Sequence, residues 1–142
     1  MRIDTKNYNM LISCPSDIVD EIEIIENVVN YYNDTTAYNN YIRLNLRYWK
    51  WDSYPLMGRD PQEMLYKQFI KECDFAVAFF WTKFGSCTKK YKSGTEDEIE
   101  YFRKQGKDVS IFFSDYPIAP SMIDIPQLKN VRKYKKDIDN AQ

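Results

Sequence analysis

Apolar segments of strand length alternate along the chain with segments of helical or polar pattern. Residues 74–81, headed by an acid, and residues 109–113 are continuous apolar runs, typical of strands covered on both faces. Residues 8–13 form a third apolar run, and Pro15 soon after it indicates a turn. Residues 41–51 alternate between apolar and polar side chains, which predicts a strand with one face more exposed than the other.

Three helices are expected between these strands. The first follows a candidate N-cap at Ser16 or Asp17. Its apolar side chains recur at helical spacing and are Ile18, Ile22, Ile25, Val29 and Tyr32. The second is predicted from a cap and a proline at residues 60–61 to about residue 72. The third is predicted over residues 95–105 and stops at Gly106, since glycine is favoured just beyond a helix C-terminus.

The remaining segments complete the predicted order of elements. Residues 33–40 are polar and are predicted to form a turn, whereas residues 128–134 are predicted to form an edge strand. The order β-α-β-α-β-α-β-loop-β predicts an α/β fold with an open, parallel five-stranded sheet and helices on both faces. Residues 135–142 are predicted to be a polar tail without a closing helix. We therefore expect residues 1–142 to be a single domain that is part of a longer protein.

The composition of the chain excludes several classes of partner and site. The chain has 142 residues, 44% of them hydrophobic, and a net charge of -1 from 20 basic and 21 acidic side chains. This balance predicts no direct nucleic-acid partner, and the absence of an apolar run of about 20 residues predicts no membrane segment. The chain has no histidine, and Cys14, Cys73 and Cys87 lack Cys-x-x-Cys spacing. A metal site and a histidine-activated nucleophile are therefore not expected, and a reducing, cytoplasmic location is favoured.

Candidate site residues lie at the predicted carboxyl ends of the strands, where ligands bind in open parallel sheets. Glu98, one turn into the third helix, is the predicted catalytic carboxylate. The predicted substrate-binding residues are Ser13, Cys14, Trp51, Asp52, Trp81, Ser93, Gly94 and Thr95. The last three open a helix whose N-terminus can hold an anion, and the two tryptophans can stack on a base.

Each candidate also has a purely structural interpretation. Thr95 and Glu98 have the spacing of a capping box, in which the glutamate only binds a backbone N–H group. The lysine-rich loop before this helix is compatible with a solvated surface, and the tryptophans are compatible with ordinary packing. Cys14 is compatible with a small buried residue, because no histidine is present to activate it.

The same residues carry a resemblance to a known family. The segment Leu11-Ile12-Ser13-Cys14-Pro15-Ser16-Asp17, with Glu21 after it, resembles the N-terminal signature of a bacterial subgroup of TIR-like domains. The resemblance continues through Trp51-Asp52, Gly58, Gln62, Cys73-Asp74, Phe80-Trp81, Gly85 and Ser93 to Ile99. Ser93-Gly94-Thr95 stands where the best-known TIR pattern has a Ser-x-Trp-Cys stretch.

A second resemblance covers the Glu98 helix. The segment Gly94-Thr95-Glu96-Asp97-Glu98-Ile99, followed by Gly106-Lys107, is similar to a helix of nucleoside deoxyribosyltransferases, a related flavodoxin-like family. In both families the glutamate at the place of Glu98 acts on an N-glycosidic bond. The resemblance therefore implies a flavodoxin-like, TIR-like fold and gives Glu98 its expected role.

The implied function is cleavage of NAD with release of nicotinamide, so NAD is expected as a substrate rather than a cofactor. The TIR resemblance also implies bacterial immune signalling, such as antiviral defence, and activity on self-association or through a fused regulatory module. One alternative is a non-catalytic TIR-like interaction module with residues 51–59 as its contact surface. A further alternative keeps Glu98 but makes the protein a nucleoside or nucleotide N-glycosidase or a deoxyribosyltransferase.

Overall fold

Among the residues that the structure describes, four strands form the sheet. They are β1 (Lys6–Ser13), β2 (Ile42–Arg47), β3 (Phe75–Phe80) and β4 (Val109–Phe113). A computed structural model describes residues 4–48, 66–85 and 94–141, and in it the sheet has the order β2-β1-β3-β4 with all neighbours parallel. The first four predicted strands are thus confirmed.

The predicted fifth strand is wrong. Residues 128–134 lie within α6 (Ile125–Asn140), which also takes up most of the expected polar tail. The apolar side chains of this segment recur every third residue, at Leu128, Val131 and Tyr134, which is a helical spacing. Asp124 caps the helix by accepting a hydrogen bond from the backbone N–H of Gln127. The sheet therefore has four strands rather than five, and a closing helix follows the last one.

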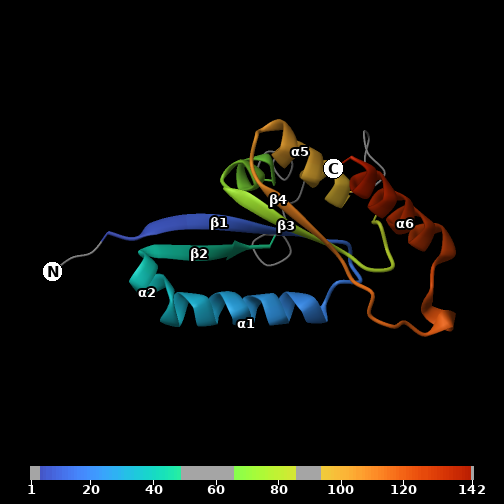
Figure 1. The fold of residues 1–142 in the computed structure, drawn as a ribbon, viewed down its shortest axis with the longest axis horizontal. Helices are drawn as coiled ribbons and strands as arrows, with labels where there is room; N and C mark the ends of the chain where they lie inside the picture. The colour runs from blue at the N-terminus through green and yellow to red at the C-terminus, as the bar shows by residue number, and fades with distance from the viewer. Residues whose placement is uncertain (1–3, 49–65, 86–93, 142) are drawn as a thin grey trace, which may run out of the picture.

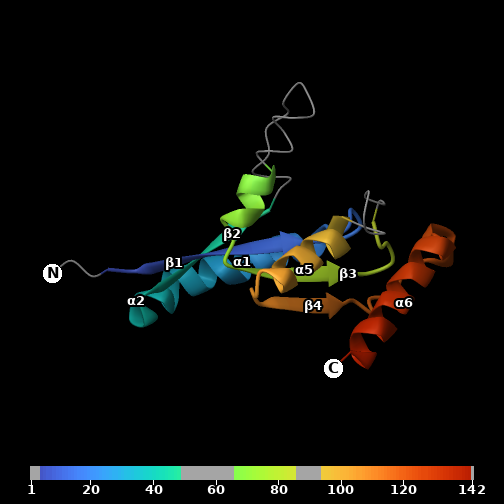
Figure 2. The same ribbon diagram turned by 90° about the horizontal axis from the view of Figure 1, so that it is seen from above.

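Helices cover both faces of the sheet, as predicted. Figure 1 shows α1 (Asp20–Thr35) on one face, with α5 (Gly94–Lys104) and α6 on the other. The view from above in Figure 2 shows α6 crossing the ends of β3 and β4. Residues 66–71 are also helical and share the face of α5, whereas the predicted start of that helix lies outside the described residues.

Two local predictions around α1 are wrong. The expected turn over residues 33–40 is helical, because α1 extends into it and is followed by α2 (Ala37–Asn40). The reversal into β2 comes at Tyr41, whose left-handed φ of 57° ends α2. Asp17 does not cap α1, whose cap position is Val19 without a side-chain bond.

The core lies on both faces of the sheet and fixes the direction of each side chain along β1. Leu11 belongs to a cluster with Phe102 of α5, whereas Ile12 belongs to a cluster with Ile22 of α1. Because side chains alternate along a strand, Ser13 returns to the face of α5. Leu11 and Ile12 are at most 2% exposed, and their apolar packing therefore directs the Ser13 hydroxyl toward the α5 helix.

Candidate functional site

The candidate site lies where the chain changes direction across the sheet. From β1 the chain first adds β2 on one side, then returns to add β3 on the other. The crevice at such a switch point, beyond the carboxyl ends of the strands, is where open α/β sheets bind ligands. Ser13, the last residue of β1, pairs in register with Ala78 of β3 at this point.

Glu98 of α5 reaches over this strand end and is held there by two hydroxyl groups. Ser13 Oγ donates a hydrogen bond to Glu98 Oε2, and the Tyr66 hydroxyl donates one to Glu98 Oε1. The three side chains come from β1, from the helical residues 66–71 and from α5. Both carboxylate oxygens are therefore fixed by groups that are distant in the sequence.

This geometry bears on the capping interpretation of Glu98. In a capping box the glutamate turns back to the N-terminus of its own helix. Within the described residues, the hydrogen bonds to the Glu98 carboxylate come from Ser13 and Tyr66, and Thr95 is itself buried with 6% of its surface exposed. Glu98 is therefore directed to the strand edge instead of serving as a helix cap.

The surroundings of Glu98 favour its neutral form more than water does. Burial raises the pKa of Glu98 above its ordinary value of 4.5, the two hydroxyl bonds oppose this shift, and the neighbouring Asp97 adds to it. Burial and the nearby Glu98 charge also raise the pKa of Tyr66, which keeps the phenol protonated as a donor. An ionised carboxylate only accepts hydrogen bonds, so two hydroxyl donors match the charged form of Glu98.

Tyr48 and Cys14 form the next layer of the site. The pKa of Tyr48 is raised chiefly by burial and further by Cys14, with which it shares a hydrogen bond, and by Glu98. Cys14 is half-buried and packs, with Tyr48, against the cluster on the α1 side of the sheet. Cys14 thus contacts Tyr48, and its role in substrate binding stays a prediction.

The other predicted binding residues are placed as follows. Trp81 packs on the α1 side of the sheet and donates from Nε1 to the carbonyl oxygen of Tyr116 at 2.8 Å. Gly94 opens α5, and open space lies where a side chain at this position would be. Trp51, Asp52 and Ser93 lie outside the described residues.

Tyr66 and Tyr48 are not among the site residues predicted from the sequence. Tyr66 falls within the predicted second helix, and Tyr48 shares the apolar alternation of the β2 segment, but neither pattern indicates the hydrogen bond from Tyr66 to Glu98 or the electrostatic effect of Glu98 on Tyr48. Only the crossing of distant elements brings these hydroxyls to the site.

A backbone clamp supports the same edge of the sheet. Asp17 Oδ2 accepts hydrogen bonds from the backbone N–H and hydroxyl of Thr82, each at 2.9 Å, and from Lys83 N at 3.0 Å. The loop after β1 is thereby tied to the loop after β3. This tie keeps Ser13 and its flanking turn in a fixed position at the carboxyl edge.

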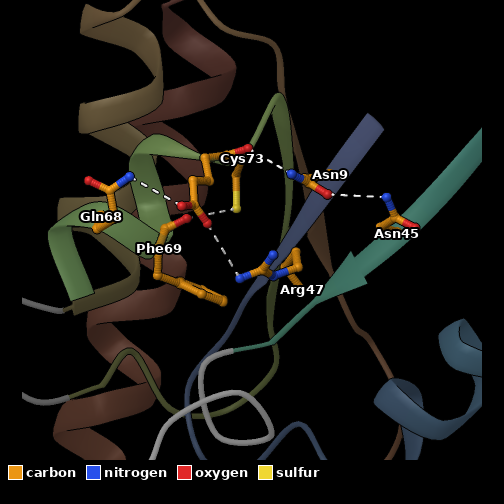
Figure 3. Close-up of polar contacts among 7 residues, drawn as sticks. Asn9, Asn45, Arg47, Gln68, Phe69 and Cys73 are labelled. Carbon is orange, nitrogen blue, oxygen red and sulfur yellow. Dashed lines mark hydrogen bonds and ion pairs between the residues drawn. The ribbon is translucent and has the colours of Figure 1, made fainter. Parts of the chain in front are cut away.

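A second glutamate, Glu72, lies in a different polar network. Its carboxylate is 3.8 Å from the Arg47 guanidinium and accepts a hydrogen bond from Gln68 at 3.1 Å (Figure 3). Figure 3 also shows Asn9 bridging this region to β2, through a bond from Asn45 at 3.3 Å. The Asn9 amide in turn donates to the carbonyl oxygen of Glu72 at 2.9 Å. The network joins β1, β2 and the chain leading into β3.

The fold places the protein among open, parallel α/β domains, and its strand order equals that of the first four strands of flavodoxin-like sheets. Residues 12–142 match the family described as "Domain of unknown function (DUF4062)", and the chain belongs to that family.

No curated protein matches the chain. A solved structure that resembles it is "2-desoxiribosyltransferase from Leishmania mexicana", with 17% sequence identity and a TM-score of 0.49. The likeness covers 76% of this chain and 65% of that protein. Among the segments described for the present chain, no helix combines the length and apolar character needed to cross a bilayer.

Proposed function

We propose that this chain is a TIR-like domain that cleaves the nicotinamide–ribose bond of NAD, with Glu98 as its catalytic carboxylate. The observation that carries the proposal is the half-buried Glu98 carboxylate, held at the carboxyl edge of the sheet by Ser13 and Tyr66. Glu98 has no cationic partner within the described residues. Its negative charge is therefore oriented but not neutralised.

The chemistry suits a carboxylate acting without histidine. When the C1′–N bond of NAD breaks, its electron pair moves to the positively charged pyridinium ring, so nicotinamide leaves as a neutral molecule without needing a proton. The ribose C1′ becomes electron-poor. A carboxylate oxygen then stabilises this carbon or bonds to it, and water completes hydrolysis, as in glycosidases.

Ser13 and Tyr66 act in this scheme as positioning residues. Each hydroxyl fixes one oxygen of Glu98 and partly offsets the cost of burying its charge. The elevated pKa of Tyr66 keeps its proton in place while the carboxylate reacts. Ser13, Cys14, Trp51, Asp52, Trp81, Ser93, Gly94 and Thr95 remain the predicted substrate-binding residues.

The experiment measures nicotinamide release from NAD by the concentrated wild-type chain. Glu98→Gln keeps the size of the side chain and is expected to abolish release. Glu100→Gln is the matched control, because Glu100 lies on the same helix but pairs with Arg103 at 3.3 Å. Undiminished activity in Glu98→Gln, or equal losses in both variants, contradicts the proposed role.

A second substrate class is favoured by the raised pKa of Glu98. A carboxyl group that retains its proton to higher pH can protonate a departing nucleobase, which the cleavage of an uncharged nucleoside requires. The protein would then be a nucleoside or nucleotide N-glycosidase or a deoxyribosyltransferase. A parallel assay with deoxynucleosides, followed by release of free base and loss of that release in Glu98→Gln, distinguishes this class from NAD cleavage.

Self-association is the proposed means of activation, and the charges of two helices support it. α1 has exposed Asp20, Glu23 and Glu26 and no basic residue, whereas α6 has five basic residues, Lys129 and Lys133 among them. These helices lie on opposite faces of the sheet (Figure 1). The acidic α1 of one copy can therefore bind the basic α6 of the next copy in a head-to-tail arrangement. Light scattering is expected to show assembly that weakens in Glu23→Lys/Glu26→Lys.

The non-catalytic alternative has a different outcome in the same experiments. An interaction module would assemble but would cleave neither NAD nor deoxynucleosides at any protein concentration. Its predicted contact surface, residues 51–59, lies outside the described residues.

A further inference from the structure

A groove lies beside the closing helix, away from the Glu98 residues. It has a volume of about 380 Å³, within the range of small-molecule sites, and lies between the loop after β3, the loop after β4 and α6. Like Glu98, it is at the carboxyl edge of the sheet, but none of Ser13, Tyr66 and Glu98 lines it. It therefore does not include the Ser13–Tyr66–Glu98 cluster, although it shares Trp81 with the predicted substrate-binding residues.

The groove combines aromatic walls with positive charge. Trp81 and Tyr116 meet edge to face at its wall, with ring centroids 6.3 Å apart, and Tyr116 is 70% exposed. Arg132 and Lys135 project into the groove from the same side of α6, since they are three residues apart on the helix. The Lys135 ammonium lies 5.8 Å from the centre of the Phe113 ring, which keeps this cation over the groove.

The two cations are not neutralised by the protein. In the described parts of the chain, neither Arg132 nor Lys135 forms an ion pair, although Asp115 also lines the groove. Two positive charges one helical turn apart, next to the exposed Tyr116 ring and the partly exposed Trp81 ring, are complementary to a ligand that combines a dianion with a flat ring. A phosphate monoester carries close to two negative charges and accepts hydrogen bonds from both guanidinium and ammonium groups.

We propose that this groove binds a small aromatic phosphate monoester. The phosphate lies against Arg132 and Lys135, and the aromatic ring packs against Trp81 and Tyr116. The site does not depend on the proposed reaction at Glu98. Binding here would bring a nucleotide to the edge of the sheet that also holds Glu98.

The test is calorimetric titration of the whole chain with AMP, adenosine and inorganic phosphate. AMP is expected to bind. Adenosine and inorganic phosphate are each expected to bind at least about tenfold more weakly, because adenosine lacks the phosphate and inorganic phosphate lacks the aromatic ring. Arg132→Ala/Lys135→Ala is expected to weaken AMP binding by at least about tenfold. Lys133→Ala/Lys136→Ala is the matched control: it removes the same charge at the same spacing from an exposed side of α6.

The outcomes separate this groove from the Glu98 site. AMP binding is expected to persist in Glu98→Gln, even if that variant and the wild type both prove inactive on NAD. The proposal is overturned if AMP does not bind, if both α6 double variants weaken it equally, or if Glu98→Gln removes binding that Arg132→Ala/Lys135→Ala retains. The thermal midpoint of each variant checks that it is folded, and all four substituted side chains are exposed.

Discussion

Glu98 and Glu72 are two glutamates near β1 with opposite surroundings. Glu72 is exposed along nearly half of its side chain, faces the Arg47 guanidinium and accepts a bond from the Gln68 amide (Figure 3). Glu98 is half-buried, lacks a cation among the described residues and receives hydroxyl bonds from Ser13 and Tyr66. The first carboxylate is paired with a cation at the surface, whereas the second is held by two hydroxyl groups.

The groups that bind a carboxylate determine which role it can have. An ion pair at the surface offsets its charge and contributes little to stability, because water screens both groups. Hydroxyl donors fix the direction of a carboxylate without cancelling its charge, at the cost of burying it. Glu98 is therefore suited to act on an electron-poor carbon, and Glu72 is suited to join β2 to the chain before β3.

The strongest test of this comparison substitutes each glutamate by glutamine. Glu98→Gln is expected to lower glycosidic bond cleavage by at least about 1000-fold, because a neutral amide neither attacks nor stabilises a cationic C1′. Glu72→Gln is expected to leave cleavage within a factor of about 2, as its effects are confined to a surface ion pair. Release of nicotinamide or free base measures both, and similar losses would remove the distinction.

Removing either hydroxyl donor to Glu98 is expected to have the next largest effect on activity. Ser13→Ala and Tyr66→Phe are each expected to lower activity about 10- to 100-fold, the range for losing one hydrogen bond to a charged group. Each also removes an interaction that lowers the Glu98 pKa, so the acidic limb of the pH–rate profile should move to higher pH. Tyr101→Phe is the control, since this half-buried tyrosine packs beside Phe102 on α5. An unchanged acidic limb contradicts the positioning role.

Stability against pH provides a third test, independent of activity. The pKa of Glu98 is raised on folding, so the folded chain binds its proton more tightly than the unfolded chain does. The contribution of Glu98 to the free energy of unfolding should therefore be fully present below the unfolded pKa near 4.5 and be lost as pH rises through the folded pKa. Each unit of elevation corresponds to about 1.4 kcal/mol. Urea unfolding of the wild type should show this decrease relative to Glu98→Gln; parallel curves would mean that the pKa is not raised.

The smallest expected effect concerns the Glu72 network. Arg47→Met removes an ion pair at 3.8 Å and the packing of the guanidinium 4.7 Å from the Phe69 ring centre, while retaining an apolar side chain. We expect a loss of about 1 kcal/mol in the free energy of unfolding, with no change in activity. Chemical denaturation and the cleavage assay measure the two quantities. A large loss of activity would show that the two glutamates are coupled.

Part of this fold could be predicted because local patterns and packing agree. The apolar runs that became β1, β3 and β4 are too short for helices and too continuous for exposed strands. The prediction for residues 128–134 was wrong because it rested on alternation, whereas the apolar residues of this segment have the three-residue spacing of a helix and pack with the cluster on the α5 face. The predicted turn over residues 33–40 was also wrong, because helical hydrogen bonds form there although the segment has few apolar side chains to indicate a helix.

Three features could be predicted from the amino-acid sequence: the parallel α/β class, the position of Glu98 one turn into a helix, and the position of Ser13 at a strand end. These features follow from the spacing of apolar residues and from the rule that parallel strands end at the same edge. The hydrogen-bond partners of the two Glu98 oxygens, in contrast, depend on the tertiary structure. These hydroxyl partners are 85 and 32 residues away, and the crossing of β1, the helical residues 66–71 and α5 brings them together. Hydrogen bonds require contact within a few ångströms, and contact between such distant residues is a property of the packed fold.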